Sequence, residues 1–255
     1  MRFYFCATAL LACGLALADA PAEILVRNEA QVAQAELDSI LKDFRVWAAR
    51  VYGYNQVRQP RPVTLKLTRS VPFGFYRDNT VIMPPDEDRW EMLDNWVHEL
   101  THHATGHDSS FFFKEGIAVH TLEALFRQEG RVPQPWPQFG HSTDAWVNLY
   151  LQRGRLMKLA DALAWPNYRG DTPDDDFRSW QIYNQAGSFI GWYIGRYGYP
   201  AFRESFKAEW PREDSATLEQ EWLESVRAKK LPLFDPAKVL PSKARYRAYA
   251  ERLKP

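Results

Sequence analysis

Two histidines and a glutamate at helical spacing carry the clearest chemistry in this chain. Residues 98–102 read HELTH, which matches the pattern H-E-x-x-H. A helix turns about 100° per residue, so His98 and His102 lie on one face, where both imidazoles can bind one zinc ion at about 2 Å. Glu99 lies beside that face and can take a proton from a zinc-bound water, whose pKa zinc lowers to about 7. The spacing therefore predicts a metal site with a general base.

The third ligand has two candidates. Glu115 lies in the segment FFFKEGIAVH, and a carboxylate from a second helix completes a His, His, Glu site with one position open to water, as in catalytic zinc centres. Gly116 has no side chain, so we expect it to let this helix approach the first one closely. The alternative ligand is His107, but Gly106 and His107 each miss the spacing of H-E-x-x-H-x-x-G-x-x-H by one position. We expect Glu115 to bind the metal, and Gly106 to end the helix.

Hydrophobic periodicity identifies the elements that must hold these residues. Apolar residues at helical spacing give the HELTH segment a core face, which favours a helix over 87–105 rather than a chance match to a five-residue motif. A second segment of the same kind predicts a helix over 111–127, and two β-rich segments predict strands over 62–68 and 79–84. The site is therefore expected where the two helices pack together.

The rest of the chain is predicted to be mostly helical. An N-terminal helix is expected around Val32–Val51, and the Pro- and Gly-rich segment 128–144 is expected to be a surface loop. An acidic run at Asp174–Asp176 is most simply a solvated helix start. Further helices are expected at 145–165 with a break near Gly154, and at 179–197, 200–210 and 215–229. The predicted fold class is α+β, with a small sheet near the N-terminus followed by a mostly helical part.

The composition is that of a folded protein. The chain has 255 residues, of which 45% are hydrophobic and 15% aromatic, which suits one domain with a well-packed core. Lys+Arg and Asp+Glu both number 32, so the net charge is zero and neither nucleic acid nor an anionic membrane is expected as the main partner. After the N-terminal segment no apolar stretch reaches membrane-spanning length.

The N-terminal segment MRFYFCATALLACGLALADA is typical of a signal peptide. We expect cleavage after Ala18, with Ala20 as the alternative, and export to the periplasm or outside the cell. Both cysteines lie in this segment, so the mature chain would have no disulfide. LLACG loosely resembles a lipoprotein box with Cys13 as the lipidated residue, but the apolar run continues after Cys13. We therefore expect a cleaved, exported protein.

Together, HELTH and FFKEGIA (Phe112–Ala118) resemble the paired motifs of gluzincins, the thermolysin-like zinc metallopeptidases, and specifically of bacterial peptidase MA-like domains. The resemblance implies a zincin-like fold and one Zn²⁺ ion bound by His98, His102 and Glu115. It also implies Glu99 as the general base and Tyr183, which opens YNQAGSFIGWYIGRYG, as the donor to the oxyanion.

Softer matches extend this resemblance over about Val63 to Val226. FGFYRDNTVIM (73–83) resembles the edge strand that borders the cleft, and LEQEW (218–222) resembles the closing helix. The implied organisation is a signal peptide (1–18), an N-terminal helix and linker (19–61), a peptidase domain (62–230) and a polar C-terminal tail (231–255).

The sequence departs from the family pattern in two respects. Only residues 103–114 separate His102 from Glu115, so the connecting loop must be tight, although it can still bring the two helices antiparallel. Many relatives place an acid four residues after the glutamate ligand to orient a zinc histidine, and here that residue is Val119. Asp94 and Asp108 are the candidates for this role.

The expected function is that of an exported zinc metallopeptidase acting on a peptide or protein substrate. Two alternatives stay open: a zinc-binding envelope module without activity, and an amidase or peptidase acting on peptidoglycan. His103 is expected to meet solvent or a Tyr or Trp partner, His120 to face away from the metal, and His141 to be a surface residue or, less simply, a lid donor.

Overall fold

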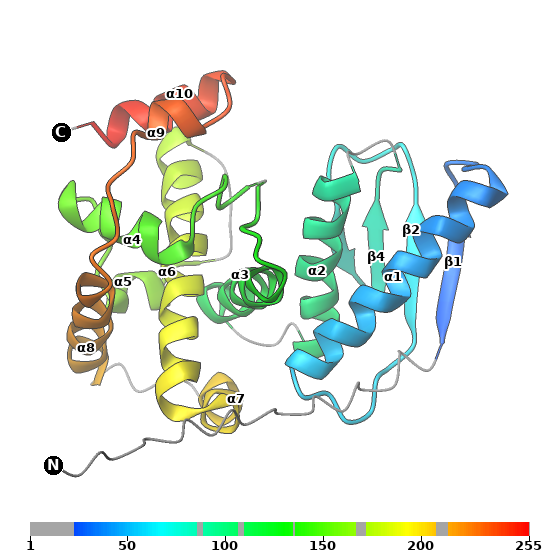
Figure 1. The fold of residues 1–255 in the computed structure, drawn as a ribbon, viewed down its shortest axis with the longest axis horizontal. Coiled ribbons are helices and arrows are strands. Elements are labelled where there is room, and N and C mark those ends of the chain that lie inside the picture. The colour runs from blue at the N-terminus through cyan, green and yellow to red at the C-terminus, as the bar shows by residue number, and fades with distance from the viewer. Residues whose placement is uncertain are drawn as a thin grey trace, which may run out of the picture.

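The computed structural model describes residues 23–85, 89–106, 110–134, 136–166, 172–207 and 214–254. The expected signal peptide and Cys13 lie outside the described residues. Figure 1 shows the sheet with helices α1 and α2 in one half of the molecule, the later helices in the other half, and α3 between them. No helix in the described part of the chain is both long and apolar enough to cross a membrane.

A mixed four-stranded sheet has the order β1-β2-β4-β3. The strands β1 (Ile24–Asn28), β2 (Val63–Leu67) and β4 (Thr80–Met83) are parallel, and β3 (Phe75–Arg77) pairs with β4 in the antiparallel direction at one edge. The expected strands at 62–68 and 79–84 are confirmed as β2 and β4, and the α+β class is confirmed. Strand β1 was not predicted from the sequence, and the structure adds it beside β2.

The hairpin between β3 and β4 turns through two residues with positive φ. Asp78 and Asn79 have φ angles of 49° and 57°, a left-handed conformation that short polar side chains tolerate. Two such residues in succession are typical of the tight turns whose twist matches that of paired strands. This turn sets the edge strand β3 beside helix α2, with which it is in contact.

Helices α1 (Gln34–Tyr54) and α2 (Arg89–Thr105) share a hydrophobic core with the sheet. The rings of Phe44 and Trp96 meet edge to face in this core, with centroids 5.6 Å apart, and both side chains are fully buried. Helix α2 is followed by Gly106, whose φ is 87°, as expected for a glycine that ends a helix. The expected helix carrying HELTH is therefore confirmed.

Helix α3 (Phe111–Gln128) packs between α2 and α6 (Pro173–Tyr197). The expected helix at 111–127 is confirmed, but Figure 1 shows α3 crossing α2 steeply rather than lying antiparallel to it. We expected Gly116 to let α3 approach α2, but this glycine faces α6 instead. A Cβ atom there would lie 2.6 Å from both Ala186 Cβ and Ile190 Cδ1, so the glycine allows a close approach between α3 and α6.

The second half of the molecule is helical, as expected. Besides α6, it contains α4 (Thr143–Gln152), α5 (Leu159–Leu163), α7 (Tyr199–Lys207) and α8 (Ser215–Ala228). The helical segment is interrupted between α4 and α5 near Gly154, as expected, and the φ of this glycine is 60°. Helix α6 begins before the expected Ser179, because Thr172 accepts a hydrogen bond from the backbone N–H of Asp175 and Pro173 suits the first turn.

The C-terminal segment is not the polar tail that we expected. It contains α9 (Pro236–Val239) and α10 (Ala244–Arg252). Tyr246, Tyr249 and Leu253 are buried there, and the ring of Tyr249 stacks on Trp180 with centroids 5.0 Å apart. The basic residues around these tyrosines hid one apolar stripe, which the aromatic side chains of α4 and α6 cover.

Candidate metal centre

Three side chains from two helices meet at a single point. The Nε2 atom of His98 lies 3.1 Å from Nε2 of His102 and 3.2 Å from Oε2 of Glu115. The third side of this triangle, from His102 Nε2 to Glu115 Oε2, measures 3.3 Å. The three side chains are largely buried, with exposed fractions of 13%, 5% and 8% for His98, His102 and Glu115. The structure thus brings together the ligands that the sequence predicted.

These separations suit a small tetrahedral cation. Ligand atoms about 2.0–2.1 Å from such an ion, at tetrahedral angles, lie about 3.3 Å from one another. The three sides of the triangle are 3.1, 3.2 and 3.3 Å. Two imidazole nitrogens and one carboxylate oxygen are also a donor set that zinc accepts. The residues present therefore fit a metal ion, and this group can hold one.

The charges of the triad are mutually dependent. Burial alone would raise the pKa of Glu115, but the imidazoles of His102 and His98 hold the pKa of this carboxyl well below its usual range. Burial alone would lower the pKa of His98, yet its hydrogen bond to the Glu115 carboxylate and the charges of Glu99 and Glu115 raise this pKa above its ordinary value. The buried carboxylate is therefore balanced by positive charge on the imidazoles, and a bound cation would take the place of the proton that carries this charge.

Glu99 follows His98 on α2 and is itself buried, with an exposed fraction of 8%. Burial raises the pKa of Glu99 to about 7. The charge of His98 opposes this shift, and the charge of Glu115 adds to it. The backbone of Tyr76, in the edge strand β3, also hydrogen-bonds to the Glu99 carboxylate. The carboxylate expected to act as general base is thus held between α2 and β3, beside the triad.

Lys114 is a site residue that the sequence reasoning missed. Its Nζ atom lies 3.4 Å from Glu115 Oε1, the oxygen that does not face the imidazoles. The same ammonium group lies 5.9 Å from the centre of the Phe111 ring. A lysine within the apolar run FFFKEG was the signal in the sequence, because a charge at that position needs a partner.

Tyr183 lies next to the triad, as the resemblance implied. Its ring stacks on that of His98, with centroids 6.2 Å apart and an interplanar angle of 27°. The Phe111 ring meets the Tyr183 ring edge to face, with centroids 5.4 Å apart, and the centroid of Trp136 lies 4.3 Å from that of Tyr183. Tyr183 therefore belongs to the site, within a group of aromatic rings that starts at His98.

The remaining histidines described are not part of the triad. His103 is buried, hydrogen-bonds to the Tyr52 hydroxyl and lies 3.1 Å from the Pro62 carbonyl, so the tyrosine partner we expected is confirmed. His120 faces away from the metal, with Nε2 2.7 Å from the Tyr54 hydroxyl. His141 is partly buried rather than a surface residue, since its ring stacks on Phe234 at 3.7 Å.

Three further sequence predictions concern the surroundings of the triad. Asp94 is buried on α2, one helical turn before His98, with an exposed fraction of 3%. It therefore stays a candidate for orienting that histidine. The alternative ligand His107 and the alternative partner Asp108 lie outside the described residues.

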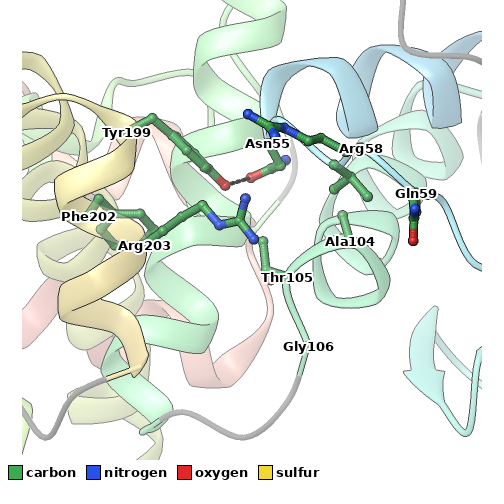
Figure 2. Close-up of a pocket in the computed structure, with 10 residues that line it drawn as sticks. Asn55, Arg58, Gln59, Ala104, Thr105, Gly106, Tyr199, Phe202 and Arg203 are labelled. Carbon is green, nitrogen blue, oxygen red and sulfur yellow. Dashed lines mark hydrogen bonds between the residues drawn. The ribbon is translucent and has the colours of Figure 1, made fainter.

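A separate pocket of about 610 Å³ lies at the C-terminal end of α2. Figure 2 shows its lining from the segment after α1, from the end of α2 and from α7, including Arg58 and Arg203, and a hydrogen bond of 2.8 Å from the Tyr199 hydroxyl to Asn55. None of the triad residues lines it. This hollow is therefore distinct from the triad.

Comparisons with protein-family models, with curated proteins and with solved structures find no match to this chain. The function of the centre is therefore inferred from its own residues: three converging ligand atoms, a buried glutamate beside them, and the aromatic and cationic side chains that adjoin them.

Proposed function

We propose that this chain is an exported zinc-dependent peptidase of the gluzincin type. The observation that carries the proposal is the triangle of His98, His102 and Glu115, whose sides of 3.1–3.3 Å suit a tetrahedral zinc ion, with the buried carboxylate of Glu99 beside it. A closed structural site has no use for an additional buried carboxylate at this position. The arrangement instead suits a catalytic centre.

The chemistry divides between the cation and the residues of the chain. A zinc ion bound by the triad supplies Lewis acidity, which lowers the pKa of a water and polarises a peptide carbonyl. Glu99 accepts the proton of the attacking water and returns it to the leaving amine. We assign the donation of a hydrogen bond to the oxyanion to Tyr183, whose ring lies against His98.

The same proposal covers fold, domain and location. A zincin-like arrangement is supported by the antiparallel edge strand β3, which contacts α2 and hydrogen-bonds to Glu99 through Tyr76. The peptidase domain would span residues 62–230, and the N-terminal sequence supports export to the periplasm or beyond the cell.

The test compares the parent protein with Glu99→Gln. We expect the purified parent to contain about one zinc ion and to hydrolyse casein, and the variant to keep its zinc while hydrolysis falls by about 10²-fold or more. Zinc is measured by atomic absorption, and hydrolysis by release of new amino termini. Equal activity in the variant would show that the assigned mechanism is wrong.

Intact peptidoglycan is assayed beside casein, because it distinguishes the alternatives. Cleavage of peptidoglycan alone, again lost in Glu99→Gln, identifies an enzyme that acts on the cell wall. Bound zinc without hydrolysis of either substrate identifies a binding module. A folded parent that takes up no zinc contradicts the metal centre itself.

A further inference from the structure

An exposed tryptophan lies one ring away from the metal centre. Trp136 has an exposed fraction of 36%, and its ring centroid lies 4.3 Å from that of Tyr183, at an angle of 66°. Tyr183 in turn stacks on His98, and Phe111 meets Tyr183 at 84°. A continuous aromatic surface therefore runs from a metal-binding imidazole to the solvent.

The backbone beside Trp136 is held in place from the interior of the molecule. The carbonyl of Pro137 accepts hydrogen bonds from Trp180 Nε1 at 2.8 Å and from Asn184 Nδ2 at 3.1 Å, both on α6. The carbonyl of Gln138 accepts another, of 2.7 Å, from Trp146 Nε1 on α4. The expected loop over 128–144 is thus present between α3 and α4, but buried side chains anchor its second half.

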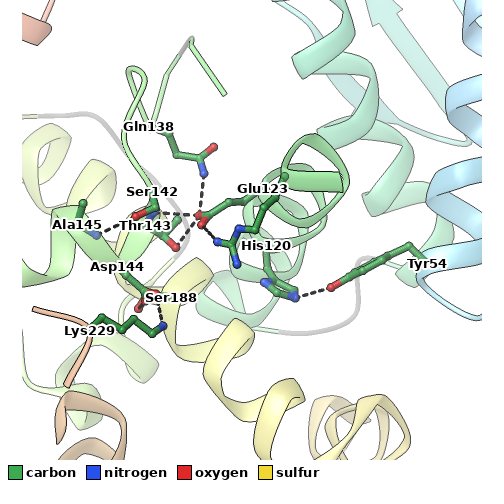
Figure 3. Close-up of polar contacts among 11 residues, drawn as sticks. Tyr54, His120, Glu123, Gln138, Ser142, Thr143, Asp144, Ala145, Ser188 and Lys229 are labelled. Carbon is green, nitrogen blue, oxygen red and sulfur yellow. Dashed lines mark hydrogen bonds and ion pairs between the residues drawn. The ribbon is translucent and has the colours of Figure 1, made fainter. Parts of the chain in front are cut away.

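A buried carboxylate completes this anchor. Figure 3 shows Gln138 and Thr143 converging on Glu123 of α3. Oε2 of Glu123 accepts hydrogen bonds from Gln138 Nε2 at 3.0 Å, from the Thr143 backbone N–H at 2.9 Å and from the Thr143 hydroxyl at 2.7 Å. Glu123 has an exposed fraction of only 5%, and Arg127 pairs with its other oxygen, Oε1, so this buried carboxylate is well compensated and ties the segment to α3.

These hydrogen bonds hold the residues that directly follow Trp136, while the indole itself stays partly exposed. Buried carbonyls need partners in any loop, but here the partners also fix the backbone that carries an indole at the edge of the site. Preorganisation of this kind serves binding, because a ligand then meets a ring whose conformational entropy has already been lost.

We infer that Trp136 and Tyr183 form a subsite for an aromatic or large apolar side chain of a peptide substrate, next to the scissile bond. This inference rests on the proposed peptidase function and names the substrate class of the same centre. The two rings meet at 66°, so they form a corner, which suits the face and edge of a third ring. A sugar ring would need a flat platform rather than a corner.

The test measures binding rather than turnover. Glu99→Gln protein loaded with zinc is titrated with labelled peptides in which a single Phe moves through an otherwise constant Ala and Ser sequence, and fluorescence anisotropy reports the Kd. We expect Phe at one position to tighten binding about 10-fold relative to Ala, because burying an aromatic side chain stabilises a complex by more than about 1.4 kcal/mol.

Matched variants in the Glu99→Gln background assign the effect to Trp136. Trp136→Ala should abolish the preference for Phe while the Ala peptide binds as before, and Trp136→Phe should keep part of it. The control is Tyr197→Ala, because Tyr197 is also exposed, at 42%, but lies at the opposite end of α6. Circular dichroism and bound zinc verify that each variant is folded.

Three outcomes would overturn the subsite. These are equal binding of all peptides, a Phe preference that survives in Trp136→Ala, and an oligosaccharide of N-acetylglucosamine that binds the parent and is lost in Trp136→Ala. Failure of the proposed function looks different: selective peptide binding without hydrolysis by the parent contradicts the peptidase and leaves the subsite standing.

Discussion

The Nζ atom of Lys114 lies 3.4 Å from Oε1 of Glu115, while Oε2 of the same carboxylate faces His98 and His102. The two oxygens of Glu115 therefore have different partners, one cationic and one in the metal centre. The lysine side chain is mostly buried, with an exposed fraction of 19%, so its ammonium group is weakly screened by solvent. This ion pair orients the carboxylate so that a single oxygen is presented as a ligand.

The first prediction concerns Lys114→Met. Methionine keeps the length of the side chain but removes the charge, so Glu115 is free to rotate and zinc affinity should fall by about 10-fold, as when outer partners of metal ligands are lost. The measurement is the zinc Kd from competition with a chromogenic chelator at fixed pH. Lys114→Arg, which can keep the ion pair, is the matched control and should bind zinc nearly as the parent does.

The charge of Lys114 also has an opposing effect on zinc affinity, so the direction of the change in Lys114→Met decides between the two effects. A positive charge near a cation repels it, and removing that charge would by itself strengthen binding. Tighter zinc binding by Lys114→Met would show that repulsion outweighs orientation and that the role assigned to Lys114 is wrong.

The second prediction separates the two candidates for the third ligand. In Glu115→Ala the zinc affinity should fall by at least about 100-fold, because two imidazoles alone form an incomplete site. His107→Ala should keep its zinc. Atomic absorption after dialysis against a weak chelator measures both. Undiminished zinc in Glu115→Ala, together with loss in His107→Ala, would make the histidine the ligand.

The centre was largely predictable because its geometry is local. His98, Glu99 and His102 owe their arrangement to one helical turn, and the position of Glu115 depends on a helix that follows directly in sequence. Lys114 was missed for a different reason. Its partner is the candidate ligand Glu115, and the role of the lysine is visible only once the contacts of each Glu115 oxygen are known.

Contacts between distant segments were less predictable. The strand β1 is recognisable only through its parallel pairing with β2, which joins Ile24 to Val63. Tyr249 is buried because its ring stacks on Trp180, and nothing in the basic C-terminal sequence predicts this contact. Periodicity identifies an element and its apolar face, whereas the surface that covers this face is decided by the rest of the chain.

The third prediction concerns the pH dependence of stability. Burial, with a smaller contribution from the charge of Arg127, lowers the pKa of His120 to about 4, against 6.5 for an ordinary histidine. Between these values the unfolded chain binds a proton that the folded chain does not. The contribution of His120 is therefore fully present above pH 6.5 and is lost as pH falls towards 4, by an amount on the order of 2–3 kcal/mol.

His120→Gln should flatten this part of the profile. The free energy of unfolding, obtained from urea titrations of the zinc-free protein at several pH values from 4 to 7, should fall less steeply in the variant than in the parent. Tyr54→Phe is the control, because it removes the 2.7 Å hydrogen bond to His120 but keeps the imidazole. It should lower stability at every pH without changing the slope. An unchanged slope in His120→Gln would contradict the assignment.

The last prediction tests the close approach that sets the position of α3. A Cβ atom at Gly116 would lie 2.9 Å from the backbone carbonyl carbon of Ala186, which cannot rotate away. Gly116→Ala should therefore destabilise the protein by about 1–3 kcal/mol, as overpacking does.

Zinc affinity should fall as well in Gly116→Ala, because α3 also carries Glu115. Gly195→Ala is the matched control, because Gly195 is helical and has no atom within 4 Å of its Cβ position. Alanine there should be neutral or stabilise by up to about 1 kcal/mol. Urea titration measures both changes, and equal stability of the two variants would show that α3 and α6 can separate without cost.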